Sequence, residues 1–66
     1  MQSDGRNIAV FDDVKGAMQE AEYCAESEDK LYAIIQFGGY FGVLPKAQVM
    51  KEDIIYETIV PKSQYQ

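Results

Sequence analysis

Hydrophobic residues recur at intervals of three and four between Val14 and Ala25, which is the spacing of one face of an α-helix. These apolar positions are Val14, Ala17, Met18, Ala21, Cys24 and Ala25. With about 100° of rotation per residue, the opposite side of the helix is polar and faces water. It carries Lys15, Gln19, Glu22, Tyr23 and Glu26. We predict that Asp12 is the N-cap of this amphipathic helix, which begins directly after it. A carboxylate at the N-cap accepts hydrogen bonds from the free N–H groups of the first turn.

Four other segments have the composition of β-strands. They are rich in β-branched and aromatic residues and are bounded by glycine, proline or charged residues. These segments are residues 7–11, 31–37, 40–44 and 53–60. Pro45 and Pro61 end the segments that precede them, because proline cannot donate to a strand ladder. Residues 46–51 are a connection with room for one helical turn.

Gly38 and Gly39 stand between two of these strands and predict a two-residue hairpin turn. That turn places Ile35 opposite Gly42 and Phe37 opposite Tyr40. The predicted order is therefore β-α-β-β-β, an α+β fold with a single helix packed on a small, mainly antiparallel sheet. The connection through the helix suits a right-handed parallel crossover, and the order of the strands beyond the hairpin stays open.

The chain has 66 residues, which is enough for one domain spanning 1–66 with a small core. Residues 1–6 and 62–66 are polar, and we expect them to be flexible tails. The first six residues lack the basic start and apolar stretch of a secretory signal, and no segment is long enough to span a membrane. Cys24 is the only cysteine and fits a reducing compartment, so we expect a cytoplasmic protein.

Both faces of the predicted sheet are apolar. In residues 31–37 the odd positions are all hydrophobic, and the even positions still include Tyr32 and Ile34. One helix covers one face only, so the other face is predicted to be exposed unless a second copy or a partner buries it. The residues assigned to self-association or a second contact are Tyr32, Ile34, Phe41 and Ile55. The alternative is a curled sheet with the chain ends lying across it.

The net charge of −5 is concentrated in one segment. Residues 12–29 hold seven acidic residues against Lys15, a balance of −6, so the remaining residues sum to +1. A negative surface repels phosphates and attracts basic partners, and direct binding of nucleic acid is therefore not expected.

The residues of catalytic and metal sites are largely missing from the chain. There is no histidine, so the usual general base and metal ligand is absent, and Cys24 has no partner for a disulfide or a zinc site. Cys24 lies on the apolar helix side and is interpreted as a core residue. Adjacent Asp12 and Asp13 are better explained by capping than by acid–base chemistry. We expect neither an enzyme nor a bound metal or cofactor.

The glycine-rich stretch 38–42 resembles a ligand-binding loop in composition, but its context differs from that of such loops. A phosphate loop would lead into a helix and usually bring a lysine, whereas this stretch leads into a strand. RNA-binding loops and aromatic strands of similar outline carry flanking basic residues that are missing here. The stretch is therefore interpreted as a turn.

Two functions remain open. The first is an inhibitor or modulator that mimics nucleic acid, in which an acidic helix binds the basic surface of a nucleic-acid-processing or defence protein. Its binding residues would be Glu20, Glu22, Tyr23 and Glu26. In size and charge the chain is similar to the short acidic proteins of phages and other mobile elements, and this likeness implies a host–virus interaction in the host cytoplasm. The second is a structural module that assembles, for example as a homodimer, through its sheet face or edge.

Overall fold

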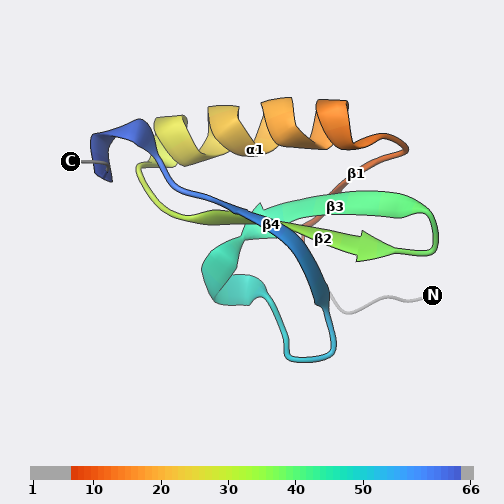
Figure 1. Ribbon diagram of the computed structural model, residues 1–66. Helices are drawn as coiled ribbons and strands as arrows, with labels where there is room; N and C mark the ends of the chain where they lie inside the picture. The colour runs from red at the N-terminus through yellow and green to blue at the C-terminus, as the bar shows by residue number, and fades with distance from the viewer. Residues whose placement is uncertain (1–6, 65–66) are drawn as a thin grey trace.

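The computed structural model describes residues 7–64 and confirms the predicted α+β fold. One helix lies across one face of a four-stranded antiparallel sheet (Figure 1). The elements are β1 (Ala9–Phe11), α1 (Val14–Glu28), β2 (Tyr32–Phe37), β3 (Tyr40–Pro45), the 3-10 helix η1 (Lys46–Gln48), β4 (Ile54–Ile59) and the 3-10 helix η2 (Lys62–Gln64). Residues 1–6 and 65–66, which belong to the predicted tails, lie outside the described residues.

The helix is capped by Asp13, and the prediction of Asp12 was wrong by one residue. Asp13 has an extended backbone, and its Oδ1 accepts a 2.8 Å hydrogen bond from the N–H of Gly16. That amide belongs to the third helical residue, which is within reach only of a side chain at the residue directly before Val14. At the other end, Asp29 adopts the left-handed conformation with φ of 55°, and its N–H donates to the carbonyl of Ala25.

The sheet has the strand order β1-β3-β2-β4, and every neighbouring pair is antiparallel. Because β1 and β2 both pair antiparallel with β3, they run in the same direction with β3 between them. The connection through α1 therefore joins two parallel strands that are not adjacent. The two edges of the sheet are the three-residue β1 and the six-residue β4.

The hairpin between β2 and β3 has the predicted register. Ile35 lies opposite Gly42, and Phe37 lies opposite Tyr40. The turn residues Gly38 and Gly39 have φ of 52° and 84°. Positive φ at both central residues matches the right-handed twist of the flanking strands, and glycine adopts it without steric cost.

A β-bulge interrupts β4. Ile34 of β2 lies opposite Glu57, but the next residue, Ile35, lies opposite Ile55. Tyr56 is the extra residue, and it reverses the alternation of side chains along the strand. As a result the two faces of β4 differ from those that strict alternation along residues 53–60 predicts.

The helix covers the main part of the core. The side chains of Ala17, Ala21 and Ala25 are fully buried against the sheet. Because these side chains are small, α1 can lie close to the sheet. Under them lie Tyr32 and Ile34, which are 6% and 0% exposed. These two residues were assigned to self-association, and the structure corrects that assignment because the helix covers the face on which they lie.

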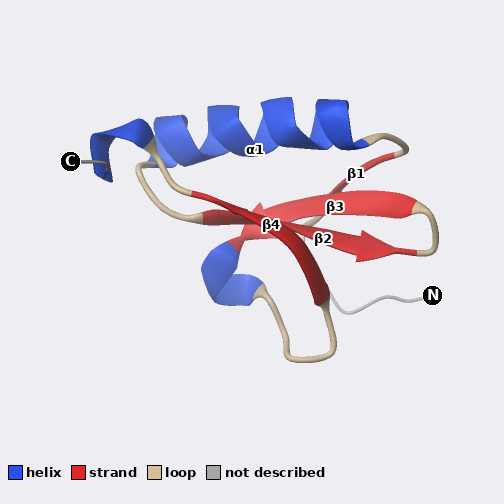
Figure 2. Ribbon diagram, in the orientation of Figure 1, coloured by secondary structure: helices blue, strands red, loops and turns tan. Residues whose placement is uncertain are grey.

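The other face of the sheet has its own cover. Ala33, Ile35 and Leu44 are buried there, with Ile8 and Val49 packed against them. Val49 belongs to the connection between β3 and β4, which lies on the side of the sheet away from α1 (Figure 2). The prediction that one helix is the only cover was therefore wrong, since Ile8, from the segment before β1, and Val49, from an irregular connection, pack against the second face.

Candidate functional site: the groove between α1 and β4

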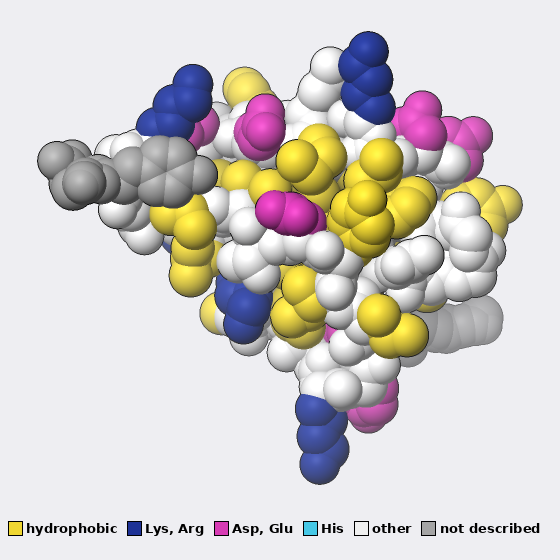
Figure 3. All heavy atoms as spheres, in the orientation of Figure 1, with side chains coloured by type: hydrophobic (Ala, Val, Ile, Leu, Met, Phe, Trp, Pro, Cys, Tyr) yellow, Lys and Arg dark blue, Asp and Glu magenta, His cyan; other side chains and the backbone are white. Residues whose placement is uncertain are grey.

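The helix lies mainly over β2 and β3, and this leaves a groove between α1 and the edge strand β4. The groove has a volume of about 680 Å³. We call it the α1–β4 groove, and it is lined by Met18, Gln19, Glu22, Tyr23, Glu26, Glu57, Thr58, Ile59, Val60 and Lys62. Figure 3 shows hydrophobic side chains gathered below the helix, with an acidic side chain among them.

Three of the four residues predicted for the acidic helix line this groove. Glu22 and Glu26 are one turn apart on α1, and Tyr23 is 70% exposed beside them. Glu20 does not line the groove. It precedes Glu22 by two residues, a rotation of about 200° around the helix, and so lies on the opposite flank of α1. There its Oε2 accepts a 3.4 Å hydrogen bond from the thiol of Cys24.

Glu57 is a residue of the groove that sequence reasoning missed. It comes from β4, where it is paired with Ile34 on the helix side of the sheet. Glu57 is the only charged residue of β4, and this is the signal that could have drawn attention to it. With Glu57, the groove has three carboxylates from two elements, against the single ammonium group of Lys62.

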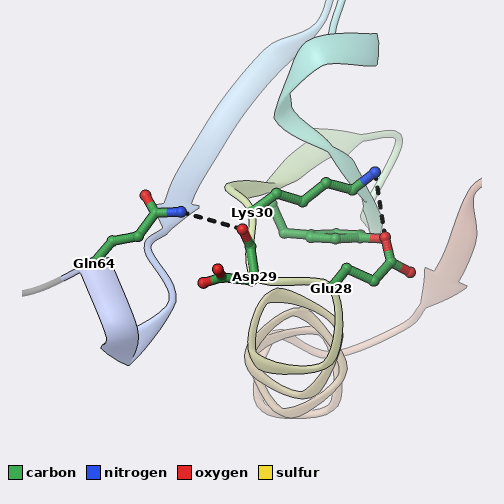
Figure 4. Close-up of polar contacts among 5 residues, drawn as sticks. Glu28, Asp29, Lys30 and Gln64 are labelled. Carbon is green, nitrogen blue, oxygen red and sulfur yellow. Dashed lines mark hydrogen bonds and ion pairs between the residues drawn. The ribbon is translucent and has the colours of Figure 1, made fainter.

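The C-terminal segment closes one end of the groove. The N–H of Lys62 donates a 2.5 Å hydrogen bond to Oε2 of Glu26. The hydroxyl of Ser63 donates to Oδ1 of Asp29. Nε2 of Gln64 donates to the Asp29 carbonyl at 3.2 Å (Figure 4). Residues 62–64, which the sequence predicts as the start of a flexible tail, thus form η2 and contact the end of α1.

A second polar cluster lies on the flank of α1 that carries Glu20. The hydroxyl of Tyr32 donates to Oε1 of Glu28 at 2.9 Å, and Nζ of Lys30 is 3.3 Å from the same oxygen. Burial, together with the hydrogen bond to the Glu28 carboxylate, raises the pKa of Tyr32 to about 12. The hydrogen bond from Tyr32, and then that from Lys30, lower the pKa of Glu28.

Cys24 lies close to this cluster and is half-buried. Burial raises the pKa of its thiol, and the hydrogen bond to Glu20 raises it further. A thiol with a raised pKa is protonated at neutral pH, and the thiolate is the nucleophilic form. The arrangement therefore stabilises an unreactive cysteine, in agreement with its interpretation as a core residue.

The N-terminal half of β4 exposes apolar side chains. Ile54, Ile55 and Tyr56 are 66%, 42% and 47% exposed. The ring of Tyr56 packs edge-on against that of Phe41, with centroids 5.2 Å apart and an interplanar angle of 73°. Of the residues predicted for self-association, Ile55 is exposed, and Phe41 is partly buried against the helix-side core.

Within residues 7–64 no three His, Cys, Asp or Glu side chains lie close enough together to hold a metal ion. In the same range no helix has the length and apolar character needed to cross a membrane. No family model, curated protein or solved structure matches the chain.

Proposed function

We propose that this protein is a small acidic binding module whose α1–β4 groove engages a basic surface of another protein and so inhibits or modulates it. The observation that carries the proposal is the meeting of Glu22 and Glu26 from α1 with Glu57 from β4 around one groove. Carboxylates held on two packed elements can take the place of phosphates in the basic site of a nucleic-acid-processing or defence protein.

The groove combines this charge with apolar area. Met18 and Val60 are partly exposed and contribute hydrophobic surface, and Tyr23 offers an exposed ring of the kind that dominates binding energy at protein interfaces. Glu22 and Glu26 repel each other at their spacing of four residues, which costs an isolated helix a few tenths of a kcal/mol. A basic partner removes that repulsion and gains long-range attraction as it approaches.

A catalytic function has less support. The chain has no histidine, and the thiol of Cys24 is held in its protonated form.

The unpaired Cys24 is compatible with a reducing compartment. We propose that the protein acts in the cytoplasm, which would be the host cytoplasm if the protein is of phage type.

The test is a pull-down from lysate of the source cell at low and high salt, using variants matched in net charge. The double variant Glu22→Lys, Glu26→Lys reverses the charge of the groove. The double variant Glu20→Lys, Glu52→Lys makes the same change in net charge outside the groove. We expect the first pair to lose the partner and the second to retain it, with binding weakened by salt because exposed charge pairs are screened. Equal capture by both pairs would contradict the proposal.

A second candidate function is self-assembly through β4. It is favoured by the three consecutive apolar residues Ile54, Ile55 and Tyr56, which lie exposed on an edge strand. Light scattering would then give the mass of a dimer at both low and high salt, and Ile54→Lys would reduce it to that of a monomer. A monomeric wild-type protein at high concentration would eliminate this candidate.

A further inference from the structure

The outer edge of β4 has no strand beside it among residues 7–64. The direction of the backbone N–H and C=O groups along β4 follows from the hydrogen bonds between β2 and β3. The N–H of Lys46 donates to the carbonyl of Leu31 at 3.0 Å, which makes this pair hydrogen-bonded across β2 and β3. Backbone groups alternate in direction along a strand. Tyr32 and Ile34 therefore direct their N–H and C=O groups away from β3 and toward β4.

The same alternation assigns the backbone of β4. Ile59 lies opposite Tyr32 and Glu57 opposite Ile34, so their backbone groups point toward β2. Thr58 lies between them, and its N–H and C=O point outward. Thr58 thus offers a donor and an acceptor at the free edge of the sheet.

This free edge faces the α1–β4 groove. Three consecutive residues of β4, 57–59, line the groove. Successive side chains of a strand point to opposite faces, so three in a row cannot all reach one groove through their side chains. The edge backbone itself must form part of the lining, and the free groups of Thr58 lie where a ligand in the groove would meet them.

We infer that the groove binds its partner as an extended basic segment, which adds to β4 as a fifth strand; this rests on the proposed function and specifies the form of the partner. Backbone hydrogen bonds to Thr58 would supply affinity that does not depend on sequence. Alternate side chains of the added strand point toward α1. Lysine or arginine at those positions would meet Glu22, Glu26 and Glu57.

Charge favours a basic segment over a second copy of the chain at this edge. Two copies paired antiparallel through β4 would share one continuous sheet, with both helices on the same face. Their two grooves would then adjoin and bring six carboxylates together with only the two Lys62 side chains. Like charges placed opposite one another across strands are destabilising, whereas a basic strand has the complementary charge.

The test uses a labelled short peptide of alternating lysine and valine, measured by fluorescence anisotropy at low salt. Thr58→Pro removes the outward N–H and leaves the ladder to β2 intact, because proline is tolerated on the free side of an edge strand. Thr58→Ala is the matched control and keeps the N–H. We expect Thr58→Pro to weaken binding about tenfold, as the loss of one hydrogen bond implies, and Thr58→Ala to bind like the wild type.

A second measurement covers the case in which Thr58→Pro does not fold. In the wild-type protein the peptide should slow amide hydrogen exchange at Thr58, because that N–H becomes hydrogen-bonded only in the complex. Unchanged exchange at Thr58 in a saturated complex would overturn the inference.

The remaining outcomes separate the inference from the proposed function. If a helix-forming peptide of the same charge binds and the strand-forming peptide does not, strand addition is overturned while recognition of a basic partner stands. If neither peptide binds, both are overturned. A wild-type dimer that Thr58→Pro dissociates would assign the edge to a second copy and would also overturn the inference.

Discussion

The phenol of Tyr32, the first residue of β2, donates a 2.9 Å hydrogen bond to Oε1 of Glu28, the last residue of α1. The same carboxylate is 3.3 Å from Nζ of Lys30, in the short connection between the two elements (Figure 4). The phenol comes from a residue buried under the helix, and the carboxylate is at the surface. This contact therefore ties the end of the helix to the sheet beneath it.

This contact makes stability depend on pH at both ends of the scale. Folding raises the pKa of Tyr32 from 10.0 to about 12, so its contribution is complete below pH 10 and is lost as the pH rises through about 12. Folding lowers the pKa of Glu28 from 4.5, so its contribution is present above pH 4.5 and is lost as the pH falls through the lowered value. Thermal unfolding across pH should show both losses.

Tyr32→Phe should reduce both losses, because it removes the phenol and the hydrogen bond together. We expect it to cost on the order of 1 kcal/mol near neutral pH. It should also remove the latest phase from the absorbance titration of the tyrosines. Tyr40→Phe at the exposed hairpin turn is the control, and an unchanged alkaline loss in Tyr32→Phe would contradict the assignment.

The helix cap gives a prediction that separates two adjacent aspartates. Asp13→Ala should destabilise the protein by about 1 kcal/mol, because the N–H of Gly16 loses its acceptor. Asp12→Ala should change the free energy of unfolding by no more than about half as much, since Asp12 is exposed and next to the cap rather than in it. Urea unfolding of the two variants measures the difference, and an equal loss in both would argue against Asp13 as the cap.

The predictable parts of the fold depend on local chemistry. The intervals of three and four from Val14 to Ala25 locate the helix, and Gly38 with Gly39 sets the register of the hairpin. Both signals act within one element or one turn. The acidic residues Glu22 and Glu26 were recognised for the same reason, because helical spacing alone places them on one side.

The unpredicted parts depend on contacts between distant segments. The bulge at Tyr56 changes which β4 residues face the helix, and no single residue signals it. The position of β4 at the sheet edge arises from its pairing with β2 rather than with β3, its neighbour in sequence. Glu57 lies on the same side of the bulge as Ile59, so its assignment to the groove depends only on the pairing of β4 with β2. Likewise, Val49 covers the second face from a connection that has no periodic pattern.

Gly42 gives a prediction about packing on that second face. A Cβ atom at this position would lie 2.8 Å from Cγ2 of Ile8, 3.0 Å from Cε1 of Phe37 and 3.2 Å from Cγ1 of Ile35. Gly42→Ala should therefore destabilise the protein by roughly 1–3 kcal/mol through overpacking. Combining it with Ile8→Ala, which removes the closest atom, should cost less than the sum of the two single changes. Strict additivity in chemical denaturation would show that Ile8 does not cause the strain.

The environment of Cys24 predicts a slow thiol. Its pKa is raised first by burial and then by the hydrogen bond to Glu20, so little thiolate exists at neutral pH, and its partial burial limits access. A colorimetric thiol reagent should therefore react more slowly with the folded protein than with the protein in denaturant. Glu20→Gln removes the negative charge that opposes ionisation and should speed the reaction of the folded protein, whereas Glu22→Gln on the other flank of α1 should not. Equal acceleration by both variants would assign the effect to net charge, and no acceleration by either would show that Glu20 does not contribute to the raised pKa of Cys24.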